Sequence, residues 1–200
     1  MREVELKAVV DDLPTTRNLL EKAGARLSFE GRLSDRRYDV ESRELAGRDE
    51  VLRVRRYHAP GLSKTFFDWK GPTETQDVYK IREEVSTLVE DIEALNKILA
   101  RLGFMVTMEI DRDIAQYELA GATIRFETYP RMDVLVEVEG QPDSIDNAIE
   151  ALGLARGRFS SDRLAGFVAR FEQRTGVRAA VCDRELEGDY RFRPDGSLTS

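Results

Sequence analysis

Charged and apolar residues alternate along several stretches of this chain, and this period of two constrains the fold more than any other feature. In EVELK (residues 3–7), Glu3, Glu5 and Lys7 share one face of a strand, because side chains two residues apart point the same way. Strands are also predicted at residues 51–57, 64–71, 79–87, 105–119, 122–129 and 133–140. The faces opposite the charges are mostly apolar, as expected of a sheet with one buried side.

Apolar residues with a helical period lie between these strands. Thr15 or Thr16 is the predicted N-cap of a helix that ends at Gly24, and further helices are predicted over 92–104, 144–154 and 160–176. The order of strands and helices suggests an α+β chain with two related halves. Residues 176–200 are polar and include RPDGS, so we expect a loosely held C-terminal tail.

Composition and charge exclude several classes of protein. The chain is 41% hydrophobic and 34% charged, a globular balance, and it has no run of eighteen apolar residues and no apolar leader. A formal net charge of -7 argues against a nucleic-acid or membrane partner. The single cysteine, Cys182, fits a reducing compartment, so we expect a cytoplasmic protein.

The charged faces of the strands have two explanations. Either they face solvent, or the sheet closes into a barrel with the charges inside. Surface faces normally mix in neutral polar residues, whereas these positions are almost all Glu, Arg or Lys. Buried charges must be paired or must bind a ligand. A polyphosphate with a divalent metal ion satisfies both signs, since Arg and Lys bind phosphate oxygens and carboxylates bind a hard cation.

Five motifs, in order along the chain, carry a resemblance to a known family. They are EVELKA, LRVRR, DWKGP, IREEV and VLVEVEG. Residues 1–175 resemble the CYTH family, the triphosphate tunnel metalloenzymes, and are most similar to its class IV adenylate cyclase branch. The resemblance implies an eight-stranded antiparallel β-barrel, the triphosphate tunnel, with helices packed outside.

The resemblance also implies roles for particular residues. Lys7, Arg55 and Lys70 would be catalytic. Two positions depart from the family pattern: Ile114 stands where a second cation is common, and Glu127 stands where Asp is common. Glu84 is a further residue that would face the inside of the tunnel. The implied ligands of Mg2+ or Mn2+ are Glu3, Glu5, Glu137 and Glu139, and the implied phosphate-binding residues are Lys7, Arg53, Arg55, Lys70, Arg82, Arg112 and Arg125.

Three functions remain open at this point. A cyclase would convert ATP to cyclic AMP and pyrophosphate, and this is the first choice on the resemblance. An inorganic or thiamine triphosphatase would release orthophosphate, and a non-catalytic module would only bind polyphosphate. Neither His58 nor Cys182 is assigned any chemistry. The apolar stripe of helix 160–176 is expected to pack outside the barrel or to form a homodimer contact.

Overall fold

The computed structural model describes residues 2–76 and 79–193. The side chains of residues 2–4, 75–76 and 79–81 lie outside this description, so the predicted metal ligand Glu3 has a place on a strand but no described side chain. In chain order the strands are β1 (Arg2–Val9), β2 (Arg26–Asp39), β3 (Val51–Ala59), β4 (Leu62–Lys70), β5 (Glu74–Gln76), β6 (Tyr79–Val89), β7 (Met105–Leu119), β8 (Ala122–Thr128) and β9 (Leu135–Glu139). The helices are α1 (Leu13–Lys22), α2 (Glu44–Gly47), α3 (Ile92–Arg101), α4 (Pro142–Ala151), the 3-10 turn η1 (Arg156–Arg158), α5 (Leu164–Thr175) and α6 (Asp183–Leu186).

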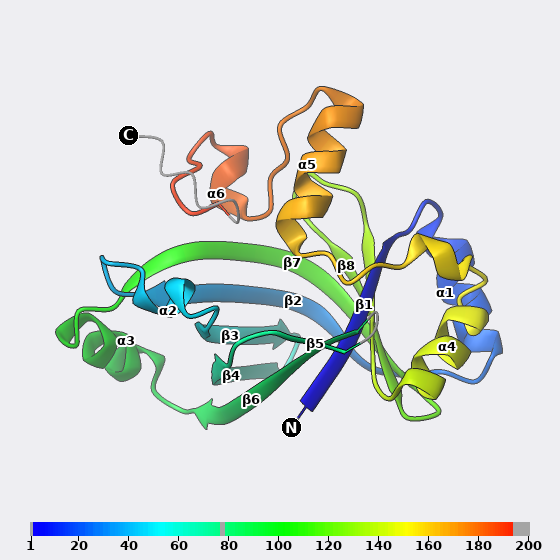
Figure 1. Ribbon diagram of the computed structural model, residues 1–200, viewed down its shortest axis with the longest axis horizontal. Helices are drawn as coiled ribbons and strands as arrows, with labels where there is room; N and C mark the ends of the chain where they lie inside the picture. Colours follow the sequence, from blue (N-terminus) through cyan, green and yellow to red (C-terminus); the bar gives the residue numbers. More distant parts are fainter. Residues whose placement is uncertain (1, 77–78, 194–200) are drawn as a thin grey trace.

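All described strands belong to one strongly curled antiparallel sheet (Figure 1). Its order is β1-β9-β8-β7-β2-β3-β4-β6-β5. Strand β1 pairs with β9 along its C-terminal half, and residues 2–5 also pair with β6. The predicted eight long antiparallel strands with helices outside are therefore confirmed, with the three-residue β5 in addition. The regular closed barrel is corrected to a curled sheet whose two ends meet only along this short β1–β6 pairing.

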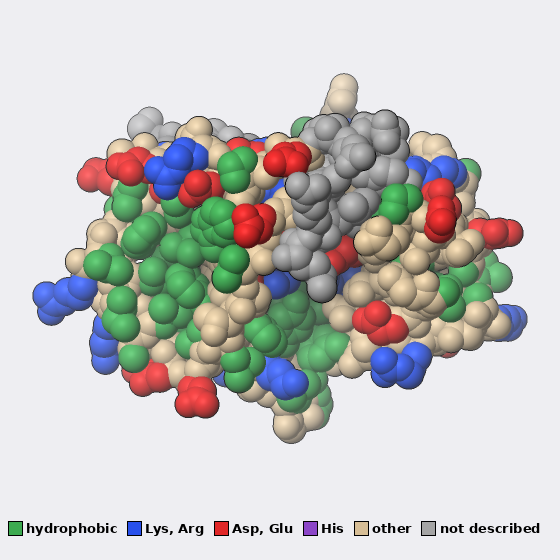
Figure 2. Space-filling model, turned by 60° about the horizontal axis from the view of Figure 1, so that its bottom comes forward, with side chains coloured by type: hydrophobic (Ala, Val, Ile, Leu, Met, Phe, Trp, Pro, Cys, Tyr) green, Lys and Arg blue, Asp and Glu red, His purple; other side chains and the backbone are tan. Residues whose placement is uncertain are grey.

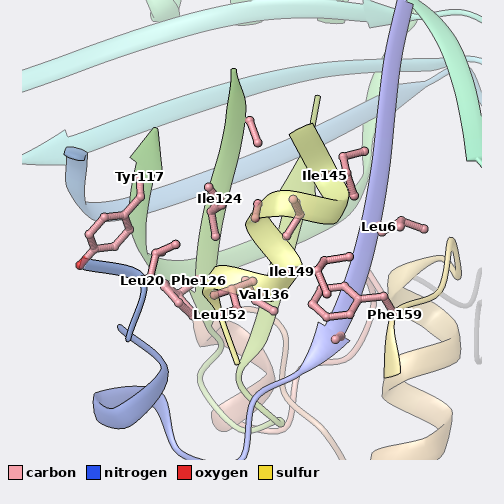
Figure 3. Packing of buried hydrophobic residues seen from close by; sticks show 14 of the residues in the cluster. Leu6, Leu20, Tyr117, Ile124, Phe126, Val136, Ile145, Ile149, Leu152 and Phe159 are labelled. Carbon is pink, nitrogen blue, oxygen red and sulfur yellow. The ribbon is translucent and has the colours of Figure 1, made fainter. Parts of the chain in front are cut away.

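The apolar core lies outside the curl, between the convex face of the sheet and the helices. Helices α1 and α4 cover β1, β8 and β9, and their side chains interdigitate with the sheet (Figure 3). Leu6, Ile124 and Val138 on the strands, Ile145 on α4 and Leu152 at its C-cap are at most 1% exposed. Burying side chains of this size contributes about 1.5–3 kcal/mol each. The alternation in the sequence therefore has its apolar side outward, and its charged side faces the inside of the curl.

Strand β2 is a strand that the sequence pattern did not reveal. It is 14 residues long and pairs with both β3 and β7. Charges lie on both of its faces: Asp35 and Arg37 point inward, while Arg36 bonds Asp111 and Arg32 bonds Asp183 on the other side. An apolar face is the signal that periodicity detects, and β2 lacks one over this stretch.

Helix α1 begins earlier than predicted. Its N-cap is Asp12, whose carboxylate accepts the backbone N–H of Thr15 at 3.0 Å and the Thr15 hydroxyl at 2.7 Å. Pro14, whose missing N–H costs nothing in the first turn of a helix, fits this start. The predicted N-cap at Thr15 or Thr16 is therefore wrong by about one turn. The three other predicted helices correspond to α3, α4 and α5 within a few residues, whereas the short α2, η1 and α6 were not predicted.

The C-terminal segment 176–193, here called the C-terminal arm, is packed rather than loosely held as predicted. Beyond the end of β8, the edge of β7 is free to bind it: the N–H of Asp111 donates to Val181 O at 2.8 Å, and that of Glu109 donates to Phe192 O at 3.1 Å. Ala179, Ala180 and Val181 are at most 1% exposed. A polar composition hid this short apolar anchor, and residues 194–200 lie outside the described part.

Helix α5 packs over the curled sheet beside the C-terminal arm. Phe167 and Val168 are 4% exposed and contact Tyr129, Leu135 and the arm. The apolar stripe of this helix is thus used within the chain, as one of its two predicted roles required. Figure 2 shows other hydrophobic side chains gathered on one face of the molecule. β6 and α3 contribute exposed apolar residues. The homodimer stays a prediction. No described helix is both long and apolar enough to cross a membrane.

Cys182 gives a direct test of whether the arm is docked in solution. It is 1% exposed, and burial raises the pKa of its thiol to about 11. Only about a thousandth of the thiol is then ionised at pH 8, and thiolate is the reactive form. We expect a thiol reagent to label the native protein far more slowly than the urea-unfolded protein. Equal rates for both forms would show that the arm is not held as described.

Candidate functional site

A cavity of about 450 Å3 lies within the curl of the sheet and beneath α5. Among the described residues, twelve Lys and Arg side chains but seven Asp and Glu side chains line it, in a chain whose net charge is -7. Such a concentration of cations attracts anions. Nine residues predicted from the sequence come together here: Glu5, Lys7, Arg53, Arg55, Lys70, Arg82, Arg112, Arg125 and Glu137.

Lys7 lies at the centre of an acidic cluster on β1 and β9. Its Nζ is 2.7 Å from Glu137 Oε2 and 3.0 Å from Glu5 Oε1. The other oxygen of Glu137 is 3.2 Å from Arg125 Nη1 on β8. The register explains this cluster, because Lys7 is opposite Glu137 and Glu137 is opposite Arg125 on adjacent strands. Glu139 is also in register, opposite Glu5, although it does not line the cavity.

The ionisation of this cluster is fixed by its charges. Burial alone would lower the pKa of Lys7, but the carboxylates of Glu137 and Glu5 outweigh it and raise that pKa. Burial alone would raise the pKa of Glu137, but Lys7 and Arg125 hold it well below its usual range. Lys7 and Glu137 are therefore both charged at neutral pH, and the Glu137 carboxylate is available to a metal ion.

Two arginines of β3 share one carboxylate of β4. Asp68 Oδ2 is 2.6 Å from Arg55 Nε and 3.3 Å from Arg53 Nε, and its other oxygen accepts the Ser86 hydroxyl at 2.5 Å. Asp68 is 1% exposed and does not line the cavity, whereas both arginines do. The carboxylate thus anchors the arginines from behind, and their guanidinium groups face the cavity.

Glu127 on β8 organises a second buried group. Its Oε1 is 2.7 Å from Arg112 Nε, and its Oε2 accepts the Tyr129 hydroxyl at 2.6 Å. Arg112 Nη1 has no hydrogen-bond partner within the described residues, and the residue is 6% exposed. A buried donor without a partner is costly unless a ligand satisfies it. Ile114, the departure from the family pattern, is 3% exposed and does not line the cavity.

Lys70 on β4 and Arg82 on β6 line another part of the cavity. Lys70 forms an ion pair with Glu84 on β6. Glu84 does not line the cavity itself and contributes to the site through this contact with Lys70. Arg82 donates through Nε to Gly71 O at 2.6 Å and through Nη2 to the backbone oxygen of Asp49. Burial lowers the pKa of Arg82. The contacts with Glu84, Gly71 and Asp49 hold both cations in position at the cavity.

Sequence reasoning missed the contribution of β2. Asp35 is 1% exposed and lies 3.6 Å from Arg53, and Arg37 lies level with Arg53 on the neighbouring strand. The buried Nε of Arg37 has no hydrogen-bond partner within the described residues. Burial lowers the pKa of Arg37, and the positive charges of Arg53 and Arg112 act in the same direction. An anion in the cavity would relieve this crowding of positive charges. The sequence signal that could have revealed this face of β2 is the two-residue spacing of the charged residues 35, 37 and 39.

Two carboxylates of the cavity fit the ligand chemistry of a divalent cation. Glu5 and Glu137 both contact the Lys7 ammonium, so their carboxylates converge on one position. Carboxylate oxygen is the donor that Mg2+ and Mn2+ prefer. No group of three or more His, Cys, Asp or Glu residues is placed to hold a metal among the described residues. The donor chemistry fits a site of two carboxylates completed by substrate oxygens, which is how Mg2+ is usually bound.

The fold and the cavity together define a class of protein, in which a curled antiparallel sheet encloses a cation-rich cavity. The CYTH domain family model matches residues 1–150, and the chain belongs to this family. A Methanocaldococcus jannaschii protein named "Putative adenylate cyclase" is 31% identical over 104 residues, which cover 52% of this chain. The chain spans 57% of the length of that relative.

Solved structures of low identity share the fold. A Vibrio parahaemolyticus protein described as a "putative adenylate cyclase" has a TM-score of 0.71 at 16% identity, covering 84% of this chain and 97% of its own. The PH1819 protein of Pyrococcus horikoshii has a TM-score of 0.67 at 22% identity, with coverage of 84% and 98%. A Hippeastrum protein, described as a "putative adenylyl cyclase" with a dominant triphosphatase activity, has a TM-score of 0.58 at 12% identity, with coverage of 84% and 95%.

Proposed function

We propose that the cavity binds a triphosphate and that the protein is a divalent-metal-dependent enzyme acting on it. The observation that carries this proposal is the ring of buried cations, anchored from behind by Asp68 and Glu84, around the acidic pair Glu5 and Glu137. Phosphoryl and nucleotidyl transfer require positioning and charge neutralisation more than covalent chemistry from the protein. These residues can supply both.

Within this proposal, the cations and carboxylates have separate tasks. Arg55, Lys70 and Arg112 bind phosphate oxygens, Arg bidentately where both nitrogens are available. Lys7 neutralises charge that develops on the reacting phosphate. Glu5 and Glu137, with Glu3 and Glu139 in the complete set, hold Mg2+ or Mn2+, which when bound polarises phosphate oxygens. On binding metal and substrate, Lys7 exchanges its carboxylate contacts for phosphate oxygens.

Adenylate cyclase is our first choice among the reactions. The support is the name of the Methanocaldococcus jannaschii relative, which is 31% identical over half of this chain. In this reaction the ribose 3′-hydroxyl of ATP attacks the α-phosphorus, the new O3′–P bond closes the ring, and pyrophosphate leaves as the hydroxyl proton passes to solvent. The rate should rise toward alkaline pH, because the attacking hydroxyl must lose its proton.

Inorganic triphosphatase is the second candidate, and the cavity lining favours it. Nineteen of the described lining residues are charged, twelve cationic and seven acidic, and such a lining can hold a substrate made of phosphate alone without a nucleoside pocket. Water would then attack the terminal phosphorus and orthophosphate would leave. A module that only binds polyphosphate is a weaker proposal, because binding an anion alone does not require carboxylates beside the cations.

One experiment separates these functions. The purified protein is incubated with Mg2+ or Mn2+ and with ATP and inorganic triphosphate in parallel, and the products are separated. Cyclic AMP with pyrophosphate is expected for the cyclase. Orthophosphate without cyclic AMP would overturn that choice in favour of the triphosphatase, and tight binding of both substrates without any product would favour the binding module. The cytoplasmic location and the lack of a nucleic-acid partner stay predictions.

A further inference from the structure

The outer part of the cavity carries cations that the triphosphate site does not require. Arg163, directly before α5, and Arg191 and Arg193 of the C-terminal arm all line it. These three residues, here called the outer cations, lie outside the part of the chain that the family model matches, residues 1–150. They are therefore not covered by the match to the family model.

The outer cations are fixed in position by carboxylates, as the inner ones are. Arg193 is 7% exposed, and its Nη2 is 2.8 Å from Glu172 on α5. Arg191 donates through Nε and Nη2 to Asp189, at 2.9 and 2.7 Å. Glu172 and Asp189 do not line the cavity. Arg163 is 2.7 Å from Asp49, which itself lines the cavity. The buried Arg193 therefore repeats the arrangement of Arg53 and Arg55 in front of Asp68, whereas Arg163 and Arg191 form exposed ion pairs that line the cavity.

The surroundings strengthen one of these charges. Met108, Ile110 and Leu164 line the same cavity, and Arg193 is the outer cation that is buried, at 7% exposure, where a lower local dielectric increases the attraction between an anion and a cation. The backbone bonds between the arm and β7 keep Arg191 and Arg193 at the cavity. Arg37, whose Nε has no partner within the described residues, adds a further cation to the same lining.

We propose that the outer cations form a subsite for a fourth phosphate, so that the cavity prefers linear phosphate chains longer than three. The proposal rests on the triphosphate site proposed above and extends it outward, whichever reaction follows. The arm is then part of the substrate site and selects for chain length. A wild-type protein should accordingly bind linear tetraphosphate more tightly than linear triphosphate.

The test compares these two probes by calorimetry in the presence of Mg2+, at constant ionic strength. The double variant Arg163→Gln, Arg191→Gln removes two outer charges whose side chains are 67% and 68% exposed, so the fold should survive. We expect its affinity for tetraphosphate to fall about tenfold or more, the scale for losing charged hydrogen bonds, while its affinity for triphosphate changes less than about twofold.

The control double variant, Arg170→Gln, Arg174→Gln, removes the same charge from α5 at residues that do not line the cavity. It should bind both probes as the wild type does. Equal losses for both probes in the outer variant, no loss for either, or a wild type that does not prefer tetraphosphate would each overturn the subsite. A wild type that binds neither probe would instead overturn the triphosphate site itself.

Discussion

Replacing Glu5 with glutamine should remove most Mg2+- or Mn2+-dependent turnover while leaving the fold intact. Glutamine keeps the size of the side chain but loses the charge that holds a hard cation. The Glu5 side chain is 27% exposed, and Lys7 keeps its 2.7 Å contact with Glu137, so the strand pairing does not depend on Glu5. A loss of about a hundredfold or more is expected if several kcal/mol of charge stabilisation disappear.

A matched variant separates metal binding from general effects of charge. Glu30→Gln removes a carboxylate that is 53% exposed, bonds Arg17, and does not line the cavity. Turnover of both variants is measured against metal concentration, with circular dichroism to check the fold. Glu30→Gln should match the wild type. Normal turnover in Glu5→Gln at every metal concentration would exclude Glu5 as a metal ligand.

The sequence predicted those parts of the fold in which charge and apolarity separate cleanly onto two faces. β1, β3 and β9 have this pattern, and the cavity residues they carry, such as Lys7, Arg55 and Glu137, lie where alternation put them. Their outward neighbours pack beneath helices with the ordinary helical period. Period and residue type together therefore predicted most of the described inner site.

The parts that escaped prediction depend on contacts between distant segments. β2 is charged on both faces because one face meets the cavity and the other meets Asp111 of β7 and Asp183 of the C-terminal arm. The arm is polar overall, yet Ala179–Cys182 pack against α5 and bond the free edge of β7. Neither contact has a local period, so the outer cations could be found only from the folded structure, whereas the spacing of residues 35, 37 and 39 was a signal for Arg37.

Replacing Arg55 with glutamine should weaken triphosphate binding by about 2–4 kcal/mol, which is roughly 30- to 1,000-fold. Arg55 faces the cavity, and its position is fixed by the 2.6 Å contact with Asp68 and a 3.3 Å bond to the Tyr57 hydroxyl. Without it, Asp68 keeps Arg53 and Ser86 as partners. The carboxylate is therefore not left buried and unpaired, and the loss should fall on the ligand rather than on the fold.

The neighbouring residue offers the control. Arg56 belongs to the same strand but points to the other face, where its Nε donates to the Ser63 hydroxyl at 3.3 Å. Triphosphate with Mg2+ should raise the melting temperature of the wild type and of Arg56→Gln in a concentration-dependent way, because a ligand that binds only the folded state stabilises it. The shift should be much smaller for Arg55→Gln. Equal shifts of the melting temperature in all three proteins would place the phosphate chain elsewhere than beside β3. No shift in any of them at millimolar triphosphate would count against a triphosphate site in this cavity.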